Sequence, residues 1–303
     1  MSRALPILAE LPSGYFVDES PGGILALHAD VARQIHEAGY GPEHDGELRR
    51  SELSGRRALH ELRAGGERFV VRRFSHGGLM RWITGELYLD PERPFRELVL
   101  STSLRRAGIR TPQVVAARAR PARLVGWRLD LVSRRIEDTL DLGFVLGLAR
   151  QGELAPGVLP GLLSATGQLV RRLHQHGCLH ADLTPTNLLV PAAVLEGADP
   201  ELWVIDLDGS ELRPKLAAGE MVTNLRRLYR YVRRREARHG PALRRSDYLR
   251  FMIAYEPDRG RRKALVRAVV AAHRRTSLLH ALGWFFESRF ARRSDPRESS
   301  SPA

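Results

Sequence analysis

The sequence is poor in cysteine, in long apolar runs and in acidic side chains. Its 303 residues include a single cysteine, Cys178, which excludes an internal disulfide and a cysteine-based metal cluster and is typical of a reducing compartment. No apolar run reaches the roughly 18 residues that a membrane-spanning helix needs. Pro6 interrupts a short apolar run that Glu10 ends, so we expect no signal peptide there. These features predict a cytoplasmic protein.

The deficit of acidic residues leaves a strong positive charge. Lys and Arg total 48 against 35 Asp and Glu, a formal net charge of +13. Such a surface concentrates anionic partners, which include nucleic acids, anionic lipids and acidic sugars. The sequence contains no helix-turn-helix, zinc-finger or aromatic RNA-binding signature, so we expect no nucleic-acid partner. Arginine pairs and triplets between residues 226 and 275 form either solvated helix faces or a surface for an anionic partner.

Strand patterns dominate the first part of the chain, and helical patterns follow. Gly65 and Gly66 form the turn of a hairpin between two strand-like runs, and Gly108 ends a helical run. We predict an α+β fold of two lobes, with an N-terminal antiparallel sheet lobe over residues 1–133 and a helical C-terminal lobe over residues 134–303. The predicted elements are strand 22–27, helix 30–38, strands 58–63 and 68–74, helix 95–107, strands 113–118 and 126–132, a hinge at 133–136, helix 162–176, strands 188–190 and 202–205, arginine-rich helices within 220–290 and a loose end from 294.

The most informative segment runs from His180 to Asn187 and is followed by Ile205–Asp208. Transfer of a γ-phosphoryl group needs an aspartate that faces the attacking hydroxyl and oxygen ligands for magnesium. Asp182 lies five residues before Asn187, a separation that lets a tight loop present both side chains to one site. We predict that Asp182 is the catalytic base and that Asn187 and Asp206 bind Mg²⁺, with ATP as the donor. The alternative for each residue alone is a turn or capping role.

Two further residues of this segment narrow the prediction. We expect the ring of His180 to brace the loop through hydrogen bonds rather than to act as the base. Thr184 stands where protein kinases commonly have a lysine, which argues against a serine/threonine protein kinase.

The strand at residues 69–74 is predicted to supply a cation to the nucleotide phosphates. Strand alternation places Arg72 and Arg73 on opposite faces, and we choose Arg72, two residues after Val70, with Arg73 in reserve. Glu97 in the following helix is the predicted partner of Arg72, and the alternative is an unpaired surface charge. Near residue 55, backbone amides at Gly55 are predicted to approach the phosphates, although the segment 53–58 holds one glycine instead of three.

Taken together, these segments resemble the lipopolysaccharide kinase family, and most closely the 3-deoxy-D-manno-octulosonic acid (Kdo) kinases. The resemblance runs from about Gly55 to Tyr229. An arginine in the phosphate-binding strand, a double glycine after it and an aspartate at 208 in place of glycine separate this family from ordinary protein kinases. Leu207 departs from the usual phenylalanine of the family. The matching segments are residues 70–80, 93–97, 108–112, 180–187 and 205–208.

The resemblance implies a bilobal protein-kinase-like fold and ATP-dependent phosphorylation of a Kdo sugar on a lipid A precursor, at the cytoplasmic face of the inner membrane. By position it implies Asp182 as base, Asn187 and Asp206 as metal ligands, and Arg72 with Glu97 as the nucleotide-positioning pair. A lipid-linked acidic sugar (Kdo-lipid A) also accounts for the basic surface. The alternatives are a heptose kinase, a kinase of proteins or other small molecules, and a pseudokinase scaffold that uses the fold for binding only.

A late apolar group has two interpretations. Between flanking arginines it forms either an amphipathic helix on the membrane surface, which implies peripheral membrane contact, or a helix packed on the C-terminal lobe. Its members are Leu278, Leu279, Leu282, Trp284, Phe285 and Phe286.

Overall fold

The computed structural model describes residues 5–51, 59–75, 87–122 and 125–291, with side chains to residue 275. Gly55 and the double glycine at 77–78, the apolar side chains at 278–286 and the end of the chain from 294 therefore lie outside the part that is described. The strands are β1 (Tyr15–Ser20), β2 (Gly23–His28), β3 (Arg49–Arg50), β4 (Leu59–Ala64), β5 (Glu67–Arg73), β6 (Val114–Pro121), β7 (Trp127–Arg134), β8 (Thr139–Asp141), β9 (Cys178–Leu179), β10 (Leu188–Pro191), β11 (Trp203–Val204) and β12 (Glu211–Leu212). The helices are η1 (Pro6–Glu10), α1 (Ala29–Glu37), α3 (Arg93–Arg106), α4 (Leu142–Gln151), α5 (Val158–Gln175), η2 (Pro185–Asn187), η3 (Ala192–Glu196), α6 (Ala218–His239), α7 (Arg245–Tyr255) and α8 (Arg259–Ala291).

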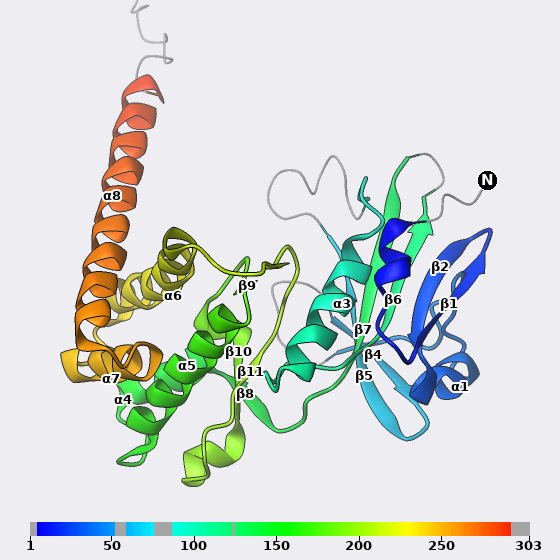
Figure 1. Cartoon of the computed structure of the whole chain (residues 1–303), viewed down its shortest axis with the longest axis horizontal. Coiled ribbons are helices and arrows are strands. Elements are labelled where there is room, and N and C mark those ends of the chain that lie inside the picture. Colours follow the sequence, from blue (N-terminus) through cyan, green and yellow to red (C-terminus); the bar gives the residue numbers. More distant parts are fainter. Residues whose placement is uncertain (1–4, 52–58, 76–86, 123–124, 292–303) are drawn as a thin grey trace, which may run out of the picture.

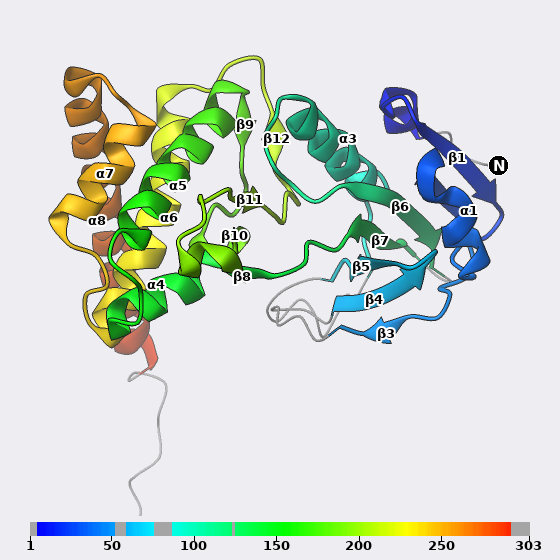
Figure 2. The ribbon, with the colours of Figure 1, turned by 90° about the horizontal axis from the view of Figure 1, so that it is seen from below.

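The large sheet and the long helices occupy opposite ends of the molecule, as Figures 1 and 2 show. The sheet is antiparallel, with strand order β1-β2-β6-β7-β5-β4-β3, and it is joined by α1 and α3. The helices α4 to α8 gather at the other end, and α8 extends past its neighbours in Figure 1. The chain order of strands followed by helices is the α+β arrangement that the sequence predicts.

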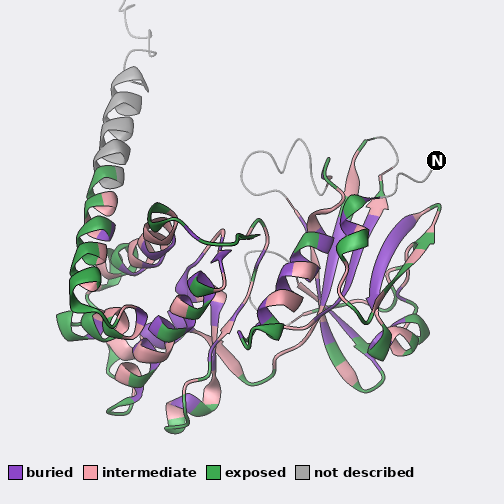
Figure 3. Cartoon of the chain, in the orientation of Figure 1, coloured by how far each residue is buried: buried purple, intermediate pink, exposed green. Residues whose placement is uncertain are grey.

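Alternation along the strands gives the large sheet two apolar faces. In β5, Phe69 and Val71 are fully buried on the face that α1 covers, while Arg72 points to the other face. The second face packs against α3 and η1 through residues such as Phe95 and Leu98. Figure 3 shows the resulting burial along the inner strands β2 and β6. Because both faces are covered, an arginine on this sheet needs an acidic partner.

Helix α3 is bounded by residues that suit its ends. Pro94 occupies its first turn, where no intrahelical donor is lost, and Gly108 follows with a φ of 71° that ends the helical run. Between these ends, Phe95 and Leu98 are buried against the sheet, whereas Leu104 is buried in the core of the helical end. Glu97 lies in the second turn and is also buried, so α3 carries a carboxylate into the interior beside β5.

The helical end of the molecule forms around α5, which precedes the segment His180–Asn187. Gly167 lets α5 approach α7, because a methyl group there would meet the Phe251 carbonyl oxygen at 2.4 Å. At the end of α5, Gly177 has a φ of 80° and lies so close to the chain at residue 213 that a methyl group would meet the Arg213 carbonyl oxygen at 1.8 Å. The turn into β9 therefore requires glycine at position 177.

A buried arginine fastens the segment before β3 to the large sheet. Arg118 is 0% exposed and bonds Asp130 on the neighbouring strand through Nε at 3.0 Å. Its other nitrogens bond Asp45 at 2.6 Å and the carbonyl oxygens of Gly41 and His44 at 2.8 and 2.6 Å. Removal of a buried charge from this network would leave its partner uncompensated.

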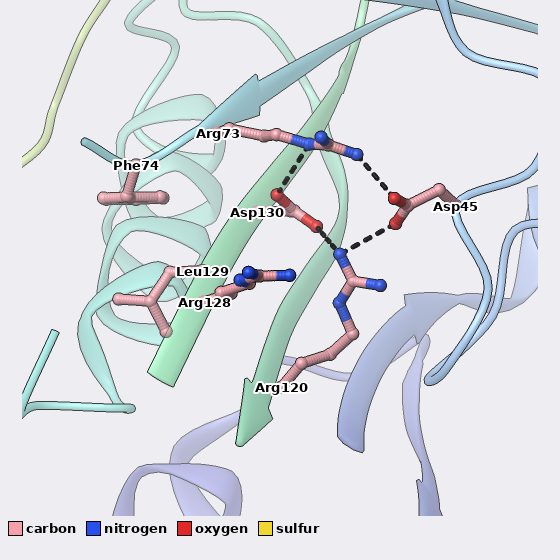
Figure 4. A pocket seen from close by; sticks show the side chains of 7 residues that line it. All are labelled: Asp45, Arg73, Phe74, Arg120, Arg128, Leu129 and Asp130. Atoms are coloured by element: carbon pink, nitrogen blue, oxygen red, sulfur yellow. Dashed lines mark hydrogen bonds and ion pairs between the residues drawn. The ribbon is translucent and has the colours of Figure 1, made fainter. Parts of the chain in front are cut away.

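The same network closes a small polar pocket, shown in Figure 4. Arg73 bonds Asp45 at 2.6 Å and lies 3.8 Å from Asp130, and Arg120 also pairs with Asp45, at 2.8 Å. The reserve cation Arg73 thus pairs on a different face from Arg72, as strand alternation requires. The pocket has a volume of about 80 Å³ and is lined by Asp45, Arg73, Phe74, Arg120, Arg128, Leu129 and Asp130.

The predicted elements correspond closely to the observed ones. The hairpin strands, the helix ending at Gly108 and the helix ending at Gly177 are confirmed as β4, β5, α3 and α5. The sequence interpretation missed β1, which pairs with β2 and extends the sheet beyond the predicted leading strand. Within the described ranges, no helix combines the length and the apolar character required to cross a membrane.

Candidate active site

Two loops meet beside the turn that leads from β9 to β10. The side-chain nitrogen of Asn187 donates to the carbonyl oxygen of Asp182 at 2.8 Å and lies 3.5 Å from its carboxylate. Pairing of β10 with β11 then brings in the second loop, where the backbone nitrogen of Ile205 donates to the Asn187 carbonyl at 3.0 Å. Asp206 follows directly. Residues 182, 187 and 206, which the sequence singles out, are thus held in two adjoining loops.

His180 connects these two loops from the interior. It is fully buried, and its Nε2 donates to the Ile205 carbonyl at 3.1 Å, while its Nδ1 accepts from the backbone nitrogen of Asp182 at 3.1 Å. Burial lowers the pKa of the imidazole, which matches a ring that must keep one nitrogen unprotonated as an acceptor. The ring is enclosed by the protein and braces the loop, as predicted.

Helix α6 supports the first loop through a buried amide. Asn224 accepts from the backbone nitrogen of His180 at 3.1 Å and donates to its carbonyl at 2.9 Å. The same amide oxygen lies 3.3 Å from Nε2 of His174, whose pKa burial lowers to about 4. Sequence reasoning missed Asn224, because nothing in the local sequence places position 224 beside position 180.

Asp206 has an unusual backbone. Its φ is 59°, in the left-handed region that residues other than glycine rarely adopt. The side chain is 45% exposed, and one carboxylate oxygen pairs with Arg72 from β5. A strained aspartate that is held at the junction of two loops is a common feature of functional sites.

Arg72 lies between two carboxylates. It pairs with Glu97 of α3 and with Asp206, and its guanidinium lies over the Phe74 ring at 4.7 Å. Burial opposes the charge of Arg72, but Glu97, Asp206 and Asp208 outweigh it and raise the pKa of the guanidinium. The structure therefore brings the predicted pair Arg72 and Glu97 together.

The carboxyl group of Glu97 has a raised pKa, although Arg72 lies beside it. It is 6% exposed, and burial raises the pKa of its carboxyl to about 7, with Asp208 and Asp206 adding to the rise and Arg72 opposing it. Three carboxylates share the neighbourhood of Arg72, and Arg93 pairs with one of them, Asp208, so two guanidinium groups face three acidic side chains. Such a site favours added positive charge.

A second arginine–carboxylate pair joins α3 to the loop after β11. Arg93 binds Asp208 through two parallel bonds of 2.5 and 2.9 Å and lies over the Tyr88 ring at 5.0 Å. This bidentate geometry fixes the loop that carries Asp206. Both residues lie in segments that carry the family resemblance, but the sequence indicates no pairing between them. The available signal was Asp208, two residues after Asp206, together with Arg93 directly before Pro94.

The side-chain oxygens of Asn187 and Asp206 suit a magnesium ion that also keeps water or phosphate ligands. Among the residues that the structure describes, no three His, Cys, Asp or Glu side chains gather as a metal site. The side-chain nitrogen of Asn187 is committed to Asp182, so its oxygen is left for another partner, and the second carboxylate oxygen of Asp206 has no hydrogen bond within the described part of the chain. One amide oxygen and one carboxylate suit Mg²⁺, which usually keeps waters and binds substrate phosphates.

Comparisons with known proteins identify the family. A sequence model of the lipopolysaccharide kinase (Kdo/WaaP) family matches residues 47–255. A 3-deoxy-D-manno-octulosonic acid kinase of Xanthomonas oryzae pv. oryzae is 30% identical over 245 residues, covering 79% of this chain and 92% of the relative. One from Actinobacillus succinogenes is 27% identical over 191 residues, or 62% of this chain and 75% of the relative.

A solved structure described as WaaP in complex with acyl carrier protein shares the fold. Its TM-score is 0.54 at 21% sequence identity, and the alignment covers 77% of this chain and 87% of that chain. The likeness confirms the kinase-like α+β fold expected from the sequence. The chain therefore belongs to the lipopolysaccharide kinase (Kdo/WaaP) family, and it is an ATP-using phosphotransferase of lipopolysaccharide core synthesis with an alcohol group as acceptor.

Proposed function

We propose that this kinase transfers the γ-phosphoryl group of ATP to a hydroxyl of the Kdo sugar on Kdo-lipid A. The observation that carries the proposal is the junction of two loops at Asp182, Asn187 and Asp206, held by the hydrogen bonds of Asn187 and His180. The names of the relatives support Kdo as the acceptor.

Asp182 acts as the base in this proposal. Its carboxylate is partly exposed and makes no ion pair within the described residues, with only the long 3.5 Å contact to Asn187. The backbone on either side is fixed, because its own nitrogen donates to His180 and its carbonyl accepts from Asn187. A carboxylate held in this way is free to orient the acceptor hydroxyl and to accept its proton.

The remaining site residues position the nucleotide. Asn187 and Asp206 would hold Mg²⁺, which supplies charge neutralisation for the transferring phosphoryl group. Arg72, held by Glu97, places a guanidinium beside Asp206 for the phosphates. Backbone amides near Gly55, in a segment outside the described residues, would complete the phosphate contacts.

The two parts of the chain take separate tasks in this proposal. Residues 1–133 form the nucleotide-binding lobe, and residues 134–303 form the catalytic and acceptor-binding lobe. A lipid-linked acceptor and a net charge of +13 favour a cytoplasmic protein with peripheral contact to the anionic inner-membrane surface.

A transfer assay with three acceptors tests the proposal. Purified protein, Mg²⁺ and γ-labelled ATP are incubated with Kdo-lipid A, with lipid A that lacks Kdo, and with a Kdo-lipid A extended by heptose. We expect label in the first acceptor, dependence on Kdo, and loss of transfer on chelation of Mg²⁺. Label in lipid A without Kdo, or a higher kcat/KM for the heptose-bearing acceptor, would move the assignment to another hydroxyl. Absence of label from all three would contradict it.

A further inference from the structure

Arg227 of α6 is a cation that contacts the backbone of the catalytic loop. One nitrogen of its guanidinium, Nη1, donates to the carbonyl oxygen of His180 at 3.1 Å and also to the carbonyl oxygen of Ala181. The segment His180–Asn187 contains no lysine or arginine. Arg227 therefore brings to this loop a positive charge that the loop itself lacks.

The bond to Ala181 acts on the peptide group that precedes the proposed base. The oxygen of this peptide group accepts from Arg227, and its nitrogen, which belongs to Asp182, donates to Nδ1 of His180 at 3.1 Å. Because a peptide group is planar, two hydrogen bonds at its opposite ends fix its orientation. The orientation of this group sets the direction in which the side chain of Asp182 leaves the loop.

Arg227 has a separate part in holding the loop. Within the described residues, the Ala181 carbonyl has no hydrogen-bond partner apart from Arg227, whereas the Ala181 nitrogen donates to the Ser210 hydroxyl at 3.0 Å. Hydrogen bonds from a charged donor are stronger than those between neutral groups. Loss of the guanidinium would consequently release one end of the peptide group before Asp182.

Helix α6 gives Arg227 a fixed support. Asn224 lies three residues earlier on the same face of the helix, is 0% exposed and bonds both the nitrogen and the carbonyl oxygen of His180, at 3.1 and 2.9 Å. Leu225 and Leu228 are buried in the core of the helical end. The part of α6 that carries Arg227 is therefore packed on one side and bonded to the loop on the other.

We propose that Arg227 is a positioning residue for phosphoryl transfer, which orients the peptide group before Asp182 so that the carboxylate faces the acceptor hydroxyl. This inference rests on the proposed role of Asp182 as the base, and it is independent of the sugar that is phosphorylated. One nitrogen makes both bonds, so the role needs a charged donor at that point rather than the planar fork of a guanidinium. A lysine should therefore replace Arg227 in part.

The test compares variants of two arginines on the same helix. Arg227→Met removes the charge and the donor, and Arg227→Lys keeps both. Arg234→Met is the matched control, because Arg234 is an exposed arginine of α6 with no hydrogen bond or ion pair within the described residues. If Arg227→Met does not fold, Arg227→Gln takes its place with the same expectations.

Two measurements are made on each variant. Transfer of label from ATP gives kcat and the KM values for ATP and for the acceptor, with whichever of the three acceptors the wild type phosphorylates. Backbone hydrogen exchange over residues 180–187 is measured without nucleotide or acceptor, so this result does not depend on the identity of the substrate.

We expect Arg227→Met to lower kcat about tenfold or more, while the KM for ATP stays within about twofold. Arg227→Lys should stay within about threefold of the wild-type kcat. Hydrogen exchange over residues 180–187 should be faster in Arg227→Met and unchanged in Arg234→Met.

A double variant adds a readout of the shared contact. Asn224 and Arg227 both donate to the carbonyl oxygen of His180. Groups that share one partner are coupled, so the loss of kcat in Asn224→Ala with Arg227→Met should be smaller than the product of the two single losses.

Three results would overturn the inference: a kcat for Arg227→Met equal to that of Arg234→Met, faster exchange with an undiminished kcat, or a kcat for Arg227→Lys as low as that for Arg227→Met. If the wild type labels none of the acceptors, the proposed function fails and hydrogen exchange alone decides the inference. Faster exchange confined to the Arg227 variants would then support it, and exchange equal to that of Arg234→Met would overturn it.

Discussion

Substitution of Glu97 by glutamine should change how the stability of the protein depends on pH. Burial raises the pKa of Glu97 from 4.5 to about 7. The folded state therefore binds this proton more tightly than the unfolded chain does. The contribution of Glu97 to the free energy of unfolding is fully present below pH 4.5 and is lost as the pH rises through about 7. At 1.36 kcal/mol for each pH unit, the loss amounts to roughly 3 kcal/mol.

Urea denaturation of the protein without nucleotide or metal measures this effect. The free energy of unfolding is compared between wild type and Glu97→Gln from pH 4.5 to about 8. Glutamine does not titrate, so the wild type should lose stability relative to the variant by roughly 3 kcal/mol across this range. The comparison between two proteins cancels the titration of groups elsewhere in the chain.

Glu61 supplies a control of opposite sign. Hydrogen bonds from Arg63 and Arg135 lower its pKa, with the bond from Arg63 the larger cause, and burial opposes the shift. Its contribution is present above pH 4.5 and is lost on acidification, so wild type should not lose stability relative to Glu61→Gln as the pH rises. A flat or rising difference between wild type and Glu97→Gln would refute the electrostatic account of the site.

Three further substitutions test the scaffold. Asp130→Asn should cost about 3 kcal/mol in urea denaturation, because it weakens the pairing of the buried Arg118, and a loss under about 1 kcal/mol would contradict that network. Gly177→Ala should cost about 2 kcal/mol or more, because its methyl group meets the Arg213 carbonyl at a positive φ, and unchanged stability would show that the turn can relax. Asn224→Ala removes both bonds to the catalytic-loop backbone and should lower kcat about tenfold or more in the transfer assay, while a kcat equal to that of wild type would argue against this brace.

Much of the fold could be predicted because its signals are local. Glycine turns and apolar alternation marked β4 and β5, and Gly108 and Gly177 marked the ends of α3 and α5. Alternation along β5 also predicted that Arg72 and Arg73 lie on opposite faces. In the structure Arg72 pairs with Glu97 on one face and Arg73 pairs with Asp45 on the other. Asp182 precedes and Asp206 follows the two short strands predicted at 188–190 and 202–205, and this order indicated one shared site.

Other parts of the site depend on contacts between distant segments. Nothing near Arg93 indicates that it binds Asp208, and nothing near Asn224 indicates that its amide supports His180. The burial of Arg118 is equally invisible in sequence, because its partner on the next strand is specified only by sheet register.

Transfer by an Asp182→Asn variant is the most direct measurement of the central claim. Asparagine keeps the size of the side chain but cannot accept the proton of the acceptor hydroxyl, so kcat with Kdo-lipid A should fall by about a hundredfold or more while the affinity for ATP is retained. A kcat close to the wild-type value, in a variant that is folded and binds ATP, would contradict the assignment of Asp182 as the base.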